Sequence, residues 1–155
     1  MRKTKQQLFL ELTKAIRDNQ AANQKLDHAV VKALGINATD GRCFDILDHH
    51  GPMPAGELAA AAGLTSGAVT QVIDRLEQKG YAERLADPED RRRVLVAITE
   101  RGREAAHGFY GPMAARAMAE LSDLSKADLE LLADFHRRTT AIQAEAADEI
   151  LRRSE

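Results

Sequence analysis

The sequence has little cysteine, few aromatic side chains and no long apolar run. Of its 155 residues, one is cysteine, none is tryptophan and only 4% are aromatic. A single cysteine, Cys43, excludes an internal disulfide and any zinc site that is built on cysteine pairs. No apolar stretch approaches the length of about 20 residues that spans a membrane, and no signal-peptide core opens the chain. We therefore expect a cytoplasmic protein with no membrane partner.

A large excess of charge of one sign is also lacking. Charged residues make up 30% of the chain and apolar residues 44%, and the formal net charge is −2. Any positive surface for a nucleic acid must therefore be local. Abundant alanine with few aromatics favours helices packed on helices over a sheet sandwich. The predicted fold is mainly α with a small β-hairpin (α+β), in a single domain over residues 1–155.

Apolar spacing and breaking residues predict the order of the elements. A long uninterrupted helix is expected over 5–34 and ends at Gly35, and Thr39 is expected to cap a second helix over 40–49. Glycine and proline at 108–112 predict a bend in the fifth helix. The remaining predicted elements are a helix over 55–62, a helix from a Thr65 or Ser66 cap to Gly80, strands over 81–85 and 94–98, and helices that start after Thr99 and after Ser125.

The fourth predicted helix has an apolar stripe and an opposite polar face. The short side chains Ser66, Gly67 and Thr70 let the helix backbone approach DNA, and the hydroxyls can reach phosphates or base edges. Gln71 can pair with adenine, and Arg75 is better placed for a phosphate. Taken alone, the pattern fits an ordinary amphipathic surface helix equally well.

Three consecutive arginines, Arg91, Arg92 and Arg93, lie between the two strands of the hairpin. A solvated charge run is the plain interpretation, but a narrow hairpin tip with arginine suits the negative potential of a DNA minor groove. We expect Asp90 to hold Arg92 or Arg93 in a fixed rotamer. A helix for the major groove with such a hairpin is the arrangement of a winged helix-turn-helix that binds double-stranded DNA. The alternative is a protein-interaction module without sequence-specific DNA binding.

Residues 36–99 closely resemble the MarR family of winged-helix transcriptional regulators. The most specific segment is the wing, Asp-Pro-x-Asp-Arg-Arg from Asp87, which is followed by a strand and a threonine-capped helix. The resemblance is strong over 36–103, and the outer helices over 5–34 and 104–153 match in length and pattern. It implies a homodimer formed by the first, fifth and sixth helices. It also implies a fourth helix in the major groove and Arg92 in the minor groove. We expect Arg91 and Arg93, on either side of Arg92, to contact phosphates.

Many members of the family release DNA when a small lipophilic or aromatic effector binds, and repression is their commoner role. The expected protein is therefore a ligand-responsive repressor with a pseudo-palindromic operator. The candidate residues for the effector pocket are His28, Phe44, Phe109 and Met113.

Apolar stripes at both ends of the chain also favour a homodimer, because a lone chain has little to bury them against. The predicted interface consists of Leu8, Leu12, Ile16, Leu132, Phe135, Ile142 and Ile150.

Other chemistries find little support. The five histidines, His28, His49, His50, His107 and His136, lack the spacing of a metal site, so we expect no metal and no cofactor. Phosphate loops and nucleophile elbows are missing from the sequence, so we expect no enzyme. Cys43 on the second helix is better explained as a small buried hydrophobe than as a redox sensor. Pro54 should leave the third helix with a weaker cap than serine or threonine would.

Overall fold

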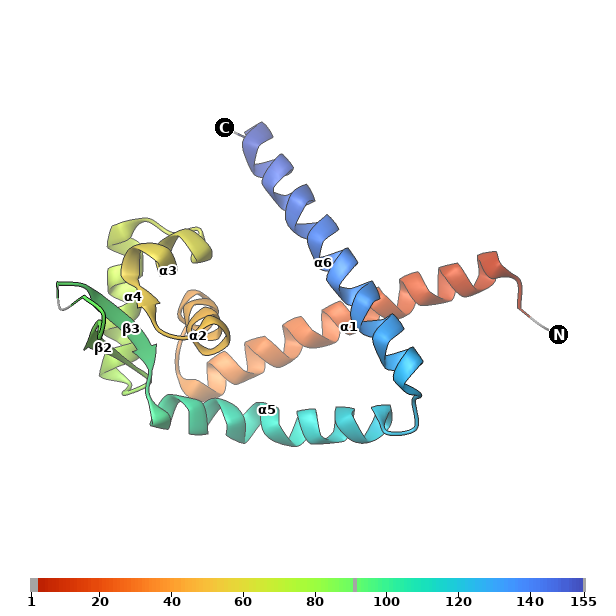
Figure 1. Cartoon of the computed structure of the whole chain (residues 1–155), viewed down its shortest axis with the longest axis horizontal. Coiled ribbons are helices and arrows are strands. Elements are labelled where there is room, and N and C mark those ends of the chain that lie inside the picture. The colour runs from red at the N-terminus through yellow and green to blue at the C-terminus, as the bar shows by residue number, and fades with distance from the viewer. Residues whose placement is uncertain (1–2, 91, 155) are drawn as a thin grey trace. The chain divides into compact units, whose positions relative to one another are not determined.

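The computed structural model describes residues 3–90 and 92–154 (Figure 1). The chain forms two compact units that divide between Tyr110 and Gly111. No helix among the described residues is long and apolar enough to cross a membrane.

The mainly α fold with a small β-hairpin is confirmed, and the elements follow one another along the colour ramp of Figure 1. In chain order they are α1 (Lys5–Leu34), α2 (Ala38–His50), β1 (Met53–Pro54), α3 (Ala55–Ala62), α4 (Ser66–Gln78), β2 (Ala82–Ala86), β3 (Val94–Ile98), α5 (Glu100–Leu121) and α6 (Lys126–Ser154).

The start of α2 differs from the prediction, because Asn37 caps it in place of Thr39. The Asn37 side chain accepts a hydrogen bond from the Asp40 backbone N–H at 2.9 Å, and the Asp40 carboxylate accepts one from the Asn37 N–H at 3.3 Å. Both residue types favour the cap position, but only Asn37 has an acidic residue three positions later to complete the reciprocal pair. The helix therefore begins two residues earlier than predicted.

The sheet has three antiparallel strands in the order β1-β3-β2. The hairpin pairs Ala82 with Ile98 at its base and Ala86 with Val94 near its tip. The short strand β1 adds to the other edge of β3, with Met53 opposite Val96. The sequence did not predict β1, because two residues that include a proline carry no strand periodicity.

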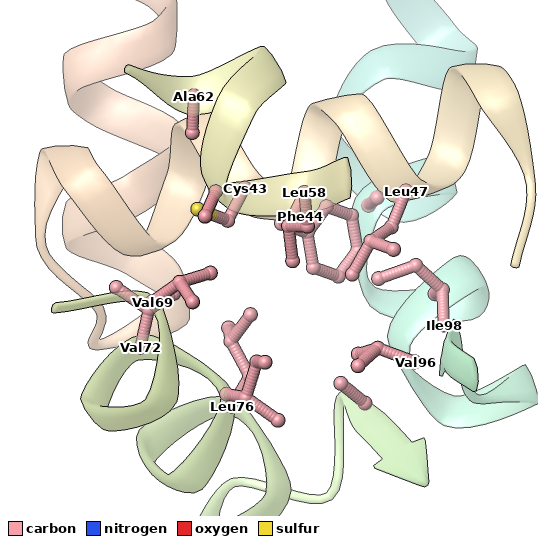
Figure 2. Close-up of a cluster of buried hydrophobic side chains, with 14 residues drawn as sticks. Cys43, Phe44, Leu47, Leu58, Ala62, Val69, Val72, Leu76, Val96 and Ile98 are labelled. Atoms are coloured by element: carbon pink, nitrogen blue, oxygen red, sulfur yellow. The ribbon is translucent and has the colours of Figure 1, made fainter. Parts of the chain in front are cut away.

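The core lies where α2, α3 and α4 meet the sheet (Figure 2). Leu47, Leu58, Ile73 and Leu76 are each 2% exposed or less. Cys43 is fully buried among them, and burial is the main cause that raises the pKa of its thiol. This confirms that Cys43 is a small core hydrophobe, since a thiol held protonated is a poor nucleophile.

A tight joint connects the sheet to the start of α5. The Thr99 hydroxyl donates a hydrogen bond to the Gly80 carbonyl at 2.6 Å and accepts one from the Gly102 N–H at 3.0 Å. A Cβ atom on Gly102 would lie 2.5 Å from the Tyr81 carbonyl oxygen. Only glycine therefore lets the first turn of α5 pack this closely on the chain that enters β2.

The second unit consists of the rest of α5 and all of α6. Ser125 caps α6 as predicted: its hydroxyl accepts from the Asp128 N–H at 3.2 Å, and the Asp128 carboxylate accepts from the Ser125 N–H at 3.2 Å. Pro112 lies inside α5 and does not end it.

Candidate nucleic-acid interface

The face of α4 that points away from the core presents short polar side chains to solvent. Ser66, Gly67, Thr70 and Gln71 are exposed, while the apolar stripe of the same helix is buried. Thr65 caps the helix by accepting from the Ala68 N–H at 3.2 Å. The start of α4 is therefore fixed, and its free N–H groups can approach a phosphate.

Two of these exposed side chains differ in how free their hydrogen-bonding groups are. The Thr70 hydroxyl donates to the Ser66 carbonyl at 2.9 Å, so its remaining capacity is to accept. The exposed Gln71 carboxamide can both donate and accept, which is the combination that adenine presents in the major groove.

Arg75 is held by a buried carboxylate on another helix. Its Nε lies 3.0 and 3.1 Å from the two Asp40 carboxylate oxygens, and its Nη2 lies 2.6 Å from Asp40 Oδ1. The Asp40 side chain is 2% exposed, whereas that of Arg75 is 41% exposed. Arg75 therefore anchors α4 to α2, and only its remaining donors are left for the predicted phosphate contact. The sequence did not reveal this pair.

Two acidic side chains of α4 pair with an arginine on the neighbouring strand. Arg84 on β2 places its Nη2 2.8 Å from the Asp74 carboxylate and also pairs with Glu77. This network offsets negative charge next to the polar face of α4.

The loop of the wing is built on hydrogen bonds from two aspartates. The Asp87 carboxylate accepts from the Glu89 N–H at 2.9 Å, and the Asp90 carboxylate accepts from the Arg92 N–H at 3.0 Å. Asp90 therefore orients the tip through the main chain and not through the predicted contact with an arginine side chain, because aspartate readily bonds a backbone N–H two residues on. Arg92 is exposed. Arg91 lies outside the described residues.

Arg93 braces the wing against α3. Its Nη2 lies 3.5 Å from Glu57 Oε1, and its Nε lies 3.7 Å from Asp87 Oδ2. The Asp87 side chain is only 10% exposed, so this partner is nearly buried at the base of the loop. The contact of Arg93 with phosphate stays a prediction, and its guanidinium is shared with two carboxylates.

A cavity of about 370 Å³ lies between α1, α2 and the first half of α5. Two of the four predicted effector-pocket residues, His28 and Phe44, line it. Phe109 and Met113 do not line it, and α5 contributes Ala106 and Tyr110 instead. Met113 moreover belongs to the second compact unit.

The cavity has an unusual electrostatic environment at its mouth. The Tyr110 hydroxyl donates to the Asp27 carboxylate at 3.1 Å. Burial, that hydrogen bond and the charges of Asp27 and Asp45 raise the pKa of Tyr110 to about 12. Partial burial and the neighbouring charges of Asp27 and Asp48 raise the pKa of Asp45 to about 6, although solvent still reaches this side chain.

The residues that could bind a metal ion are dispersed. Over 3–90 and 92–154, no three histidine, cysteine, aspartate or glutamate side chains gather in a way that could hold one. The adjacent rings of His49 and His50 instead pack edge to face, with their centroids 4.8 Å apart.

Comparison with known proteins identifies the family to which this chain belongs. The MarR family profile matches residues 36–94. YcgE of Bacillus subtilis, an uncharacterized HTH-type transcriptional regulator, is 35% identical over 151 residues, which cover 97% of this chain and 93% of YcgE. The chain belongs to the MarR family. The HTH-type transcriptional regulator MhqR of the same organism is 31% identical over 84% of this chain and 88% of its own.

The fold agrees with this assignment. A solved MarR family protein from Bacillus stearothermophilus superposes with a TM-score of 0.64 at 18% identity, over 92% of this chain and 99% of that one. The family profile and the two relatives confirm the MarR resemblance of the sequence, and the chain is a DNA-binding transcriptional regulator.

Proposed function

We propose that this MarR family protein is a ligand-responsive repressor that binds a pseudo-palindromic operator as a homodimer. The observation that carries the proposal is the pairing of an exposed polar face on α4 with an arginine-bearing wing on one rigid unit. The half-buried pair Arg75–Asp40 ties α4 to α2, and the exposed pair Arg93–Glu57 links the wing to α3. Because both elements already hold their positions, binding to neighbouring grooves of DNA would cost little conformational entropy.

Apolar side chains near the ends of the chain support the homodimer. Leu8, Phe9 and Leu12 on α1 are 50–67% exposed, and Leu131 and Ile142 on α6 are 66% and 64% exposed. A soluble monomer rarely leaves so many large apolar side chains in water. A second copy of the chain would cover them, and it would set two copies of α4 about one DNA turn apart.

The cavity supports the ligand response. Its volume lies within the range of about 300–1,000 Å³ that small-molecule sites occupy. Helix α2 contributes Phe44 to its lining and, through Asp40, also holds Arg75 on α4. A ligand that shifts α2 would therefore also shift the helix proposed to read the major groove.

A gel-shift assay with the DNA upstream of the protein's own gene tests the proposal. We expect a discrete complex that survives excess random-sequence competitor and that contains two chains per site. Competitor that removes the complex at the same concentration as unlabelled operator would contradict sequence-specific binding. It would favour the alternative of a protein-interaction module.

A further inference from the structure

We infer that the cavity between α1, α2 and α5 selects an organic cation, with an apolar aromatic body and a protonated amine. The inference deepens the proposed ligand response and rests on it. It concerns the chemical class of the ligand, which neither the fold nor the family assignment supplies.

The floor of the cavity is apolar. Val30, Leu34, Phe44 and Ala106 line it and are 3–7% exposed. Aliphatic side chains from α1 and one aromatic ring from α2 thus form a surface that suits a flat apolar group, which would gain by leaving water.

The mouth of the cavity is acidic. Asp27 on α1 and Asp45 on α2 both line it, and they approach from opposite helices. The Tyr110 hydroxyl fixes the Asp27 carboxylate with a hydrogen bond of 3.1 Å. The two carboxylates are close enough for the charge of Asp27 to disfavour ionisation of Asp45. A cation placed between them would relieve this repulsion, and an anion would add to it.

Arg42 and His28 also line the cavity and must be weighed against the carboxylates. Arg42, Asp27 and Asp45 are all exposed, so water screens the attraction of each for a charged ligand, and the comparison is of two carboxylates with one guanidinium. Tyr110 keeps its proton because its pKa is raised, so it orients Asp27 as a neutral donor and adds no negative charge of its own. The balance at the mouth therefore favours positive charge.

Three probes with one ring system and different charges test the inference: 1-naphthylmethylamine, 1-naphthalenemethanol and 1-naphthoic acid. Binding to the full-length protein is measured by calorimetry at pH 7.5 without DNA. We expect the amine to bind at least tenfold more tightly than the alcohol, and the alcohol more tightly than the acid. Equal or tighter binding of the acid, or no binding of any probe, would overturn the inference.

Substitutions at the mouth assign the selectivity to its carboxylates. Asp27→Asn and Asp45→Asn should each weaken the amine by about three- to tenfold and leave the alcohol unchanged. Asp18→Asn is the matched control, because Asp18 is an exposed aspartate of α1 that lies outside the lining, and it should change the amine by less than twofold. If all three variants weaken the three probes alike, the carboxylates do not select charge and the inference fails.

A parallel titration of labelled operator separates this inference from the proposed function. If the acid alone releases DNA, the ligand response stands and the cation class is wrong. If the amine binds with the expected selectivity but leaves DNA affinity unchanged, the class is right and the ligand response is wrong.

Discussion

At the scale of the residue, the arginines nearest the proposed DNA-binding face are not all free to contact DNA. Arg75 and Arg93 are ion-paired to carboxylates of neighbouring elements, whereas Gln71, which is uncharged, is exposed on the polar face of α4. Base preference should therefore depend more on the carboxamide than on the nearest guanidinium.

Replacing Gln71 by alanine should weaken binding to the operator by about 1–3 kcal/mol and relax the preference at one base pair, because a bidentate contact to one base is lost. Affinity for operator and for random DNA is measured by fluorescence anisotropy. Gln78→Ala, at the exposed end of the same helix, is the control and should change neither. An equal loss of affinity for operator and for random DNA in Gln71→Ala would indicate that Gln71 contacts the DNA sugar-phosphate backbone and not a base.

Replacing Arg75 by alanine should lower the free energy of unfolding by about 2–3 kcal/mol, because the buried Asp40 carboxylate loses its partner. The value is below that of a fully buried pair since the arginine itself is 41% exposed. Urea denaturation measures the loss. Arg84→Ala, whose carboxylate partners are 51% and 30% exposed, should cost less than about 1 kcal/mol. Equal losses in the two variants would show that leaving the buried Asp40 carboxylate without its arginine costs no more than leaving the exposed partners of Arg84 without theirs.

Replacing Asp45 by asparagine should raise the melting temperature at pH 7.5 and leave it unchanged near pH 4. The pKa of Asp45 rises from 3.8 to about 6 on folding, so the folded state holds this proton more tightly. Stability is therefore fully present at low pH and falls as the pH rises from about 4 to 6. Because solvent reaches the side chain, we expect a rise of only about 1–2 °C. A rise of the same size at pH 4 would contradict this cause.

At the scale of the element, periodicity predicted α1, α3 and β3 with their observed ends. Their apolar spacing is regular, and Gly35 and Gly63 end the two helices. The predicted N-cap of α2 was wrong because Asn37 and Thr39, which both favour a cap position, lie only two residues apart. The sequence did not indicate that α5 contributes Ala106 and Tyr110 to the cavity, because the apolar residues of this helix do not form a distinct stripe. The pair Asp40–Arg75 joins residues 35 apart, and spacing along one helix cannot show such a contact.

The wing should lose affinity in two different ways when its arginines are removed. Arg92→Ala should weaken binding mainly on sites with A·T-rich flanks, because a minor-groove arginine responds to groove width. Arg93→Ala should weaken all sites alike with little change in salt slope, because it removes the brace to Glu57.

Affinity on two flanking sequences over a salt series distinguishes these roles. If Arg93→Ala lowers the salt slope by about one, Arg93 contacts a phosphate and is more than a brace. If Arg92→Ala is silent on every sequence, the wing is only a solvated hairpin.

At the scale of the whole molecule, the exposed apolar side chains lead us to expect a dimer at micromolar concentration. Light scattering should give twice the chain mass, and interfaces of this kind bury about 2,000 Å² or more. Leu12→Asp should shift the protein toward a monomer, since a carboxylate at a 50% exposed leucine would be desolvated in the interface. Gln20→Asp, at an exposed polar position of the same helix, should leave the mass unchanged. A monomeric wild type would contradict the dimer.

The anchor between Asp40 and Arg75 also sets a limit on how the protein can diverge. Helix α4, which we propose reads the bases, is tied through Arg75 to a residue 35 positions earlier in the chain. A change at either position is tolerated only with a compensating change at the other, so the two should covary among relatives. If α4 were replaced by the corresponding helix of a relative, position 40 on α2 would also have to take the residue that pairs with position 75 in that relative.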